Sequence, residues 1–388
     1  MEPIRTGIIG VGIMGTSHLR MLKAQPENFT VTALCDKNPE RFKIPEAEGI
    51  THFEDYRELL DSGLCELVAV ATPHPCHGEI AMAALAKGLH VLCEKPLTDT
   101  VAKTDALIAA ARASGKVFAT NFGMRTYPLN RLIKSLIDEG RLGKILRADF
   151  VCTNWMRSQR YYDMQSWRGS WNGEGGGVLM NQAPHNLDLL YWWFGEMESV
   201  RGHLTTRFHK IETEDEVEAV FITKNGGFPV RFYANTGEAP GIDRMEIVGE
   251  KGTLIRQEDK LTFRELKKTV PEMLGGEDAF PRSESEEVEV PVPEQSAAPA
   301  VAGGKTKSGG YNSAKAGAPF IWENVASAVR EGTPLYVPGV QGWAAVEFAN
   351  AITLSHFTNS TVKFPVDRKA YDALLQELRQ GKKGLIRK

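Results

Sequence analysis

The sequence predicts an α/β domain with a doubly wound parallel sheet, followed by an α+β domain with a large, open, mainly antiparallel sheet. Three observations predict this class. In the first third of the chain, short apolar runs alternate with helical patterns, as in parallel strands that are buried on both faces. A glycine-rich segment follows the first run directly. After about Asn121, strand-like segments follow one another with only short turns between them.

The first third is predicted to hold five parallel strands with helices between them. The helical patterns cover Glu79–Lys87 and Val101–Ser114, and Gly115 is a plausible C-cap for the second. Because right-handed crossovers connect parallel strands, such helices cover both faces of the sheet. The predicted strands are Thr6–Ile9, Val31–Cys35, Leu67–Ala71, His90–Cys93 and Val117–Thr120.

The rest of the chain is predicted to begin with helices and to continue with strands. Asn225-Gly226-Gly227 is typical of a hairpin turn. Residues 291–317 are rich in Pro, Ala, Gly, Ser and Lys and predict a long surface loop. We therefore expect domains at residues 1–124 and 125–388. The predicted helices are Leu129–Glu139, Leu189–Phe194, Phe320–Arg330, Ala344–Ser355 and Arg368–Arg379, and the predicted strands are Val200–Thr206, Val217–Ile222, Val230–Ala234, Met245–Val248 and Leu261–Phe263.

Composition indicates an ordinary globular protein and excludes several classes of partner. The 388 residues are 42% hydrophobic, and 46 basic side chains nearly balance 49 acidic ones. This balance gives no reason to expect nucleic acid or a membrane as a partner. The first predicted strand begins close to Met1, which favours a cytoplasmic protein without a signal peptide. Five cysteines without a CxxC pair argue against a disulfide framework or zinc, and the histidines form no metal set.

The glycine-rich segment predicts a dinucleotide site of the Rossmann type. Gly10-Val11-Gly12-Ile13-Met14-Gly15 lies between a strand and a helix. Its first glycine permits a tight turn, its second lets backbone amides approach a pyrophosphate, and its third allows close helix packing. The N-terminus of the following helix offers N–H groups to the phosphates.

Asp36 predicts which dinucleotide binds. It ends the second predicted strand, 21 residues after Gly15. A carboxylate there accepts hydrogen bonds from the adenosine ribose and repels a 2′-phosphate, which favours NAD over NADP. The neighbouring Lys37 offers a cation that could tolerate the phosphate.

Two other strand ends carry candidate ligand groups. Thr72-Pro73 and Glu94-Lys95-Pro96 both follow apolar strands, at the sheet edge where open α/β sheets bind ligands. A charged Glu-Lys pair in this place is unfavourable for packing alone.

Three sequence blocks resemble the glucose–fructose oxidoreductase / inositol dehydrogenase family (Gfo/Idh/MocA). They are GIIGVGIMG, ATPHPCHGEIAMAALAKGLHVLCEKPL and GEGGGVLMNQAPHNLDLLYWWFG, and their order and spacing also match. The resemblance covers essentially the whole chain. It implies a soluble oxidoreductase that uses NAD.

The resemblance implies that Lys95 is the catalytic lysine, next to both nicotinamide and substrate. A lysine there accepts the proton of a substrate hydroxyl while hydride leaves the same carbon. The bond to Pro96 is typically cis in the family. Further cofactor contacts are expected at His77, Glu94, Asn121, Trp167 and Arg168.

The third block contributes His185, with a position one helical turn earlier that is commonly aspartate in the family. Here that position is Asn181, and Ala183 replaces a common glycine. Asparagine supplies neither a base nor a negative charge, so we expect it to orient the substrate or His185. The acid–base work then falls on Lys95 and His185.

An aromatic segment between the domains suggests how a sugar would be held. Three tryptophans lie between Asn154 and Trp171, interleaved with Arg, Asn and Gln. Ring faces and bidentate donors suit the C–H faces and hydroxyls of a sugar, although a lid over the cofactor or a subunit contact fits the pattern equally. Expected substrate contacts are Lys95, Arg125, Asn154, Trp155, Tyr162, Asn181 and His185. The acidic run Glu212–Glu216 is interpreted as a solvated loop.

The leading hypothesis is an NAD-dependent interconversion of a hydroxyl and a ketone on a sugar, sugar derivative or inositol. One alternative is redox-neutral glycoside cleavage or epimerisation through a transient keto-sugar, with NAD recycled in place. Another is a non-enzymatic, nucleotide-sensing regulator. The open sheet of the second domain predicts a homodimer or homotetramer.

Overall fold

A computed structural model describes residues 2–292 and 316–385, and these residues form two compact units. The first unit comprises residues 2–126, 172–175 and 316–347, and the second comprises 127–171, 176–292 and 348–385. The predicted boundary at residues 124 and 125 therefore differs from these units, because two later segments return to the first one. Most of the predicted loop at 291–317 lies outside the described residues.

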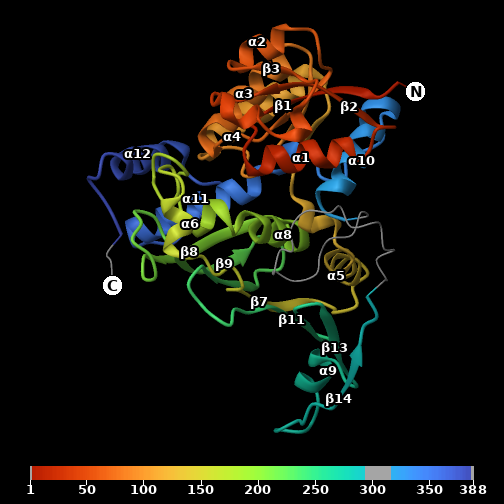
Figure 1. Ribbon diagram of the computed structural model, residues 1–388. Helices are drawn as coiled ribbons and strands as arrows, with labels where there is room; N and C mark the ends of the chain where they lie inside the picture. Colours follow the sequence, from red (N-terminus) through yellow and green to blue (C-terminus); the bar gives the residue numbers. More distant parts are fainter. Residues whose placement is uncertain (1, 293–315, 386–388) are drawn as a thin grey trace. The chain divides into compact units, whose positions relative to one another are not determined.

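The first unit is built on a six-stranded parallel sheet with the strand order β3-β2-β1-β4-β5-β6. This order reverses direction beside β1, as in dinucleotide-binding folds. Figure 1 labels β1, β2 and β3 of this sheet and the helices α1 to α4. The strands are β1 (Ile4–Ile9), β2 (Phe29–Cys35), β3 (Thr51–Phe53), β4 (Leu67–Val70), β5 (His90–Cys93) and β6 (Phe118–Thr120); the helices are α1 (Ile13–Lys23), α2 (Tyr56–Asp61), α3 (His74–Ala86), α4 (Val101–Ser114) and α10 (Ala318–Glu331), with 3₁₀ turns at Pro39–Phe42, Pro45–Ala47, Gly123–Thr126 and Gly339–Gln341.

The parallel sheet is buried on both faces, as its continuous apolar runs predict. Every residue of β4 is buried, and apolar side chains of α2, α3 and α4 pack with the strands in one core. On α1 and α10, the rings of His18 and Trp322 lie 5.5 Å apart. The sequence missed β3, a short and largely exposed strand at the sheet edge, and placed the start of α3 five residues too late. It predicted the bounds of α4 and its left-handed C-cap at Gly115 correctly.

The second unit is built on a nine-stranded sheet with the order β14-β13-β12-β11-β7-β10-β9-β8-β15. All neighbours pair antiparallel except β7 and β10, which are parallel. The strands are β7 (Ile145–Cys152), β8 (Met197–Thr205), β9 (Glu216–Thr223), β10 (Pro229–Asn235), β11 (Asp243–Gly249), β12 (Gly252–Gln257), β13 (Lys260–Leu266), β14 (Ser285–Glu289) and β15 (Val362–Lys363); the helices are α5 (Pro128–Asp138), α6 (Gln159–Asp163), α7 (Val178–Asn181), α8 (Pro184–Phe194), α9 (Val270–Leu274), α11 (Trp343–Thr358, which enters this unit at Phe348) and α12 (Arg368–Arg379).

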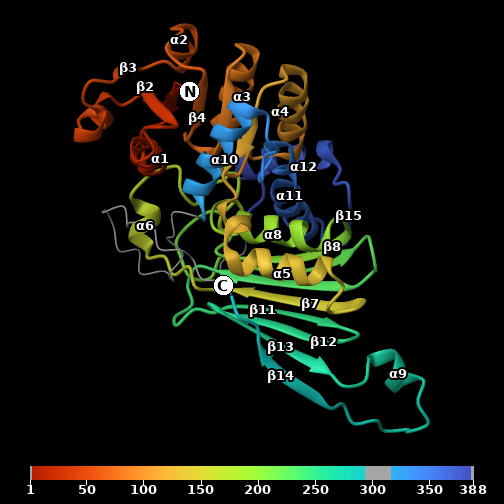
Figure 2. The same cartoon turned by 90° about the vertical axis from the view of Figure 1, so that its right-hand side faces the viewer.

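Helices of the second unit cover one face of this sheet, and Figure 2 shows α5 and α8 lying along it. The strands alternate accordingly: Ala148 and Phe150 of β7 are buried, whereas Arg147 and Asp149 between them are only partly buried. Such alternation is expected where one face meets the core and the other meets solvent. The second face of the sheet is therefore open within the described residues.

Several elements of the second unit escaped the sequence prediction. The strands β7, β12, β14 and β15 were not predicted, although the other strands and the hairpin turn at Gly226 and Gly227 were. The acidic run Glu212–Glu216 is not a solvated loop, because Glu214 and Asp215 are fully buried. Their carboxyl groups bind backbone amides, which removes the need for water. No helix among residues 2–292 and 316–385 has the length and apolarity needed to span a membrane.

A buried ion pair joins β11 and β12 of the second unit. The Arg256 guanidinium, 2% exposed, donates a short bond to Asp243 and a bond of 3.1 Å to Asn130 Oδ1. It also lies 5.3 Å from the ring centroid of Phe150. Burial raises the pKa of Asp243, although the neighbouring Arg256 opposes this effect. Removing one partner would leave the other buried without its counter-charge.

We predict that Asp243→Ala lowers the free energy of unfolding by about 3–5 kcal/mol, because it leaves the buried Arg256 guanidinium without its counter-charge. The double variant Asp243→Leu/Arg256→Met should lose much less, because it removes both charges at similar volume. Denaturant titration of both variants measures the difference. A loss below about 1 kcal/mol in Asp243→Ala would contradict this account.

Candidate active site

The glycine-rich turn of the first unit leaves no room for side chains at two of its glycines. Gly10 has φ +94°, and a Cβ there would lie 2.7 Å from the backbone of Ala71. A Cβ on Gly15 would lie 1.8 Å from the Gly10 carbonyl oxygen. The third glycine therefore lets α1 pack on the turn itself, a closer contact than the helix–strand packing expected from sequence.

Gly12 has the opposite environment, which suits a pyrophosphate. A Cβ there would meet nothing within 4 Å, and Gly12 is the N-cap of α1 without a side-chain capping bond. The next two side chains, Ile13 and Met14, are 67% and 42% exposed. The amides at this helix N-terminus can therefore bind an anion that approaches the backbone closely.

Asp36 lies beside this turn and is partly bound to it. Its Oδ2 accepts the Val11 amide at 2.8 Å, and its Oδ1 accepts the Asn38 amide at 2.9 Å. A carboxylate has about four acceptor positions, so both oxygens retain capacity for ribose hydroxyls. Lys37 is exposed next to it.

Two further strand ends meet at His77, which is 1% exposed. One ring nitrogen lies 2.6 Å from the carbonyl oxygen of Thr72, and the other lies 2.8 Å from that of Pro96. Burial lowers the pKa of His77, although the two carbonyl contacts oppose this effect. His77 thus holds together the Thr72-Pro73 and Lys95-Pro96 loops of the expected cofactor edge.

Glu94 is the centre of a buried hydrogen-bond network at the end of β5. Its Oε1 accepts from His18 Nε2 at 2.8 Å and from Asn121 Nδ2 at 2.7 Å, while Oε2 accepts the Lys95 amide at 3.2 Å. Burial alone would raise the pKa of Glu94, but these partners and the Lys95 charge lower it to about 2. Glu94 is therefore an ionised, hydrogen-bonded anchor next to Lys95.

The hydrogen bonds of His18 fix its tautomer. Trp322 on α10 donates its indole N–H to His18 Nδ1 at 3.0 Å. Because the indole nitrogen is only a donor, Nδ1 must accept, and the ring proton therefore resides on Nε2, facing Glu94. No local sequence pattern predicts this contact, because the two residues are 304 positions apart.

Lys95 lies directly after this anchor and is partly exposed. The Lys95–Pro96 peptide bond is cis. Asn121, predicted to contact the cofactor, is buried and contributes its amide to Glu94. Arg125, predicted to contact the substrate, is 1% exposed and donates to Gln341 Oε1 at 2.5 Å.

In the second unit, Asn181 and His185 lie on two helices rather than on one. Asn181 is the last residue of α7, and His185 is the second residue of α8. The chain turns at Gln182 and Ala183, whose amides both bond to the carbonyl of Val178. Both side chains are half-buried. The expected spacing of one helical turn is thus interrupted, although both residues remain close along the chain.

The aromatic segment of the second unit forms a stack of rings and guanidinium groups. The Arg168 guanidinium lies 4.2 Å from the Tyr161 ring centroid and 4.6 Å from that of Trp167, and it donates to the Tyr161 hydroxyl. Tyr162, in contrast, is buried with its hydroxyl 3.0 Å from Thr236 Oγ1. Among the predicted contacts, Asn154 is exposed, and Trp155, Trp167 and Arg168 are half-buried.

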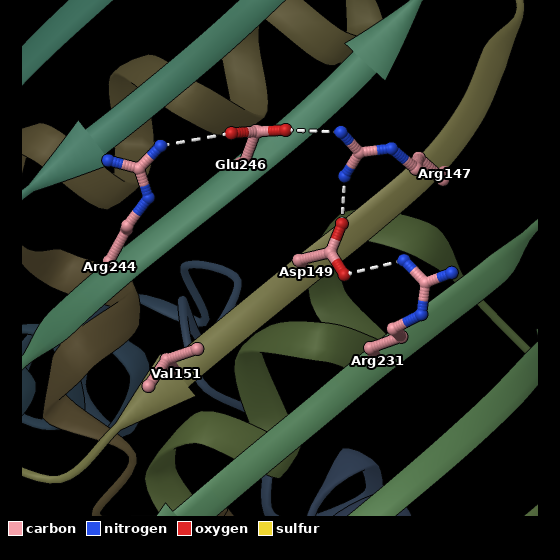
Figure 3. A pocket seen from close by; sticks show the side chains of 6 residues that line it. All are labelled: Arg147, Asp149, Val151, Arg231, Arg244 and Glu246. Carbon is pink, nitrogen blue, oxygen red and sulfur yellow. Dashed lines mark hydrogen bonds and ion pairs between the residues drawn. The ribbon is translucent and has the colours of Figure 1, made fainter.

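A depression of about 370 Å³ lies on the open face of the nine-stranded sheet (Figure 3). It contains none of the predicted site residues. Its charges form a chain of ion pairs in which Arg231 contacts Asp149 at 2.9 Å and Arg244 contacts Glu246 at 3.0 Å. Arg147 joins the two carboxylates by short bonds to both. These paired charges indicate a surface feature of the sheet rather than a site for chemistry.

The described residues offer no group of three or more His, Cys, Asp and Glu side chains arranged to hold a metal ion.

Family models match both parts of the chain. Residues 4–122 match the model described as an oxidoreductase family with an NAD-binding Rossmann fold, and residues 130–255 match the model of the GFO/IDH/MocA C-terminal domain. Together these models span more than half of the 388 residues.

Two curated proteins illustrate the relatives. A levoglucosan dehydrogenase of Pseudarthrobacter phenanthrenivorans is 32% identical over 53% of this chain and 55% of its own length, so the match spans about half of that relative. An inositol 2-dehydrogenase/D-chiro-inositol 3-dehydrogenase of Lactiplantibacillus plantarum is 30% identical over 64% of this chain and 70% of its own length.

Solved structures support the same relationship. The WlbA dehydrogenase of Bordetella pertussis, in complex with NADH and UDP-GlcNAcA, has a TM-score of 0.75 and 25% identity over 94% of this chain and 100% of its own. A levoglucosan dehydrogenase in complex with NADH and levoglucosan has a TM-score of 0.76 and 25% identity over the same shares. The chain therefore belongs to the Gfo/Idh/MocA family of oxidoreductases, whose N-terminal Rossmann domain binds NAD.

Proposed function

We propose that this protein is an NAD-dependent dehydrogenase that interconverts a hydroxyl and a ketone on a sugar, sugar derivative or inositol. The observation that carries the proposal is Lys95, which follows the buried, ionised Glu94 at the carboxyl end of β5. The similar proteins named for levoglucosan and inositol oxidation support this class of substrate.

The chain's own residues would divide the work as follows. Gly10, Gly12 and Gly15 shape the turn for the pyrophosphate, and Asp36 accepts the ribose hydroxyls. Bound NAD would accept or return the hydride. Lys95 takes the proton of the substrate hydroxyl in oxidation and returns it in reduction.

Residues of the second unit would bind and orient the substrate. We propose that His185 assists the proton transfer and that Asn181 orients the substrate through hydrogen bonds, because an amide donates and accepts but holds no titratable proton. Trp155, Asn154 and the ring stack around Arg168 offer apolar faces and donors that suit a sugar.

A redox-neutral reaction remains the second candidate within the same site. Glycoside cleavage or epimerisation through a transient keto-sugar would use the same Lys95 and NAD. Turnover without added NAD, with cofactor that stays on the protein through gel filtration, would favour it. A regulator without enzymatic activity is the third candidate, and the presence of both Lys95 and His185 argues against it.

We also propose that the open face of the nine-stranded sheet binds a second copy of the chain in a homodimer or homotetramer. The ion pairs drawn in Figure 3 join three arginines to two carboxylates on that face. Paired charges are less costly to remove from water than single charges. A face that carries both positive and negative charges can also place opposite charges against each other when it packs on its own copy across a two-fold axis.

The first prediction concerns cofactor choice. We expect a preference for NAD over NADP of roughly tenfold or more in kcat/KM, equivalent to about 1.4 kcal/mol, because Asp36 repels a 2′-phosphate. Asp36→Ala should narrow this preference, and the matched variant Lys37→Ala should not. Steady-state kinetics with both cofactors decides it. A preference for NADP that Lys37→Ala abolishes would show that the lysine governs this edge.

The second prediction concerns the proposed base. Lys95→Ala should lose roughly 100-fold or more in kcat, as general acid–base groups contribute. NADH affinity should change less than about twofold, because the phosphate and ribose contacts lie elsewhere. Turnover and fluorescence quenching by NADH measure the two effects. Lys87→Ala, on the surface with its ammonium near Asp61, serves as control. Near-normal turnover in Lys95→Ala would remove the lysine from the chemistry.

The third prediction concerns assembly. Light scattering should give a mass of two or four times the 42.8 kDa of one chain. Arg231→Glu should dissociate the assembly, because it places two carboxyl groups side by side on the open face. Lys224→Glu, in the hairpin turn, should leave the mass unchanged. A monomer of wild-type protein at micromolar concentration would rule out this assembly.

A further inference from the structure

The short helix α7, which ends at Asn181, is capped by one buried residue. Glu214 lies two positions before β9 and is fully buried. Its Oε1 accepts the amide of Gly177 at 2.8 Å and that of Leu179 at 3.0 Å. Its backbone carbonyl accepts the amide of Val178 at 2.9 Å. One residue thus satisfies the amide of the N-cap residue Gly177 and the first two amides of the helix, which have no partner inside it.

The glycines before α7 allow the backbone of this segment to lie close to Glu214. A Cβ on Gly177 would lie 1.9 Å from the Glu214 carbonyl oxygen and 2.8 Å from Thr213 Oγ1. A Cβ on Gly176 would lie 2.6 Å from Cγ of Met180. The backbone of the glycine segment therefore lies directly against Glu214. Any side chain at Gly177 would push the helix away from its cap.

Glu214 is itself held in place by its neighbour. The carboxyl group of Asp215 accepts the amides of Arg207, Phe208 and His209 at 2.7–2.8 Å and also contacts His209 Nδ1 at 3.0 Å. Burial alone would raise the pKa of Asp215, but these hydrogen bonds lower it. The loop is thus fixed on one side by Asp215 and on the other by the start of β9.

The position of Asn181 depends on this cap. The Asn181 amide bonds to the Gly177 carbonyl at 3.0 Å, and Gly177 is the N-cap residue that Glu214 holds. With only four residues, α7 has too few internal bonds to hold its own geometry. The two amides after Asn181 bond back to Val178 and so continue the chain into α8 and His185.

We propose that Glu214 is a positioning residue, which fixes α7 and thereby places Asn181 and His185 for their work on the substrate. This inference rests on the proposed function of those two residues. What the site requires of Glu214 is an acceptor oxygen at its Oε1 position. Glutamine supplies such an oxygen, aspartate holds its oxygens one methylene too far back, and alanine supplies none.

Four variants test the proposal through steady-state kinetics. Glu214→Ala should lower kcat by roughly 10- to 100-fold, as expected for small displacements of groups near the reaction. Glu214→Gln should stay within about threefold of wild type, whereas Glu214→Asp should lose more than Glu214→Gln although it keeps the carboxyl group. Glu212→Gln is the matched control, because Glu212 is exposed on the same loop and its carboxyl group accepts the Trp171 amide at 3.3 Å.

Cofactor binding and amide exchange separate positioning from a general loss of structure. NADH affinity, measured by fluorescence quenching, should stay within about twofold in all four variants, because the glycine-rich turn and Asp36 lie in the other compact unit. Hydrogen exchange at the amides of Gly177 and Leu179 should accelerate in Glu214→Ala and stay slow in Glu214→Gln.

Two results would overturn the proposal. One is a kcat in Glu214→Ala within twofold of wild type, and the other is a Glu214→Gln variant as impaired as Glu214→Asp. If Glu214→Ala does not fold, the order of Glu214→Gln and Glu214→Asp still decides. If wild-type protein oxidises no sugar or polyol, the proposed function fails separately from the role of Glu214 as a cap. Slow amide exchange at Gly177 and Leu179 in wild type and in Glu214→Gln, together with fast exchange in Glu214→Asp, would still support the cap. Equal exchange rates in Glu214→Gln and Glu214→Asp would refute it.

Discussion

The cofactor half of the site depends on one buried carboxylate, Glu94. An ionised group inside a protein is costly unless it is paired and hydrogen-bonded. Glu94 accepts hydrogen bonds from His18 of α1, from Asn121 after the end of β6 and from the amide of Lys95. The indole of Trp322 extends the same network to α10 and fixes the tautomer of His18. The backbone at Lys95 is therefore held by segments from the beginning, the middle and the end of the chain.

The second unit uses the same device with different residues. Glu214 and Asp215 are buried acids whose partners are mostly backbone amides, and each secures a segment without regular hydrogen bonding of its own. The two acids are adjacent along the chain, but Glu214 binds amides at the start of α7 whereas Asp215 binds those of residues 207–209. In both units, a buried acid thus organises the loop or short helix that carries a proposed catalytic residue.

The sequence predicted those features whose signals are local. Short apolar runs predicted most strands of both sheets. The glycines after β1 predicted the cofactor loop, because φ +94° at Gly10 and the close contact at Gly15 require glycine. Features that depend on distant partners were missed. The bond between His18 and Trp322 has no local pattern, and the burial of Arg125 follows from Gln341, 216 residues later. The acidic run was misinterpreted because a row of carboxylates usually faces water, whereas here the amides of α7 and of residues 207–209 take the place of water.

The central claim is a hydride transfer between NAD and a hydroxyl-bearing carbon of a sugar or polyol. The most direct measurement is the change in NADH absorbance when wild-type protein is offered NAD with inositols, aldoses and glycosides, and NADH with keto-sugars. This account predicts that at least one of these compounds gives a steady, protein-dependent change that stops at an equilibrium between alcohol and ketone. Tight binding of NADH without any absorbance change across the whole set would contradict it.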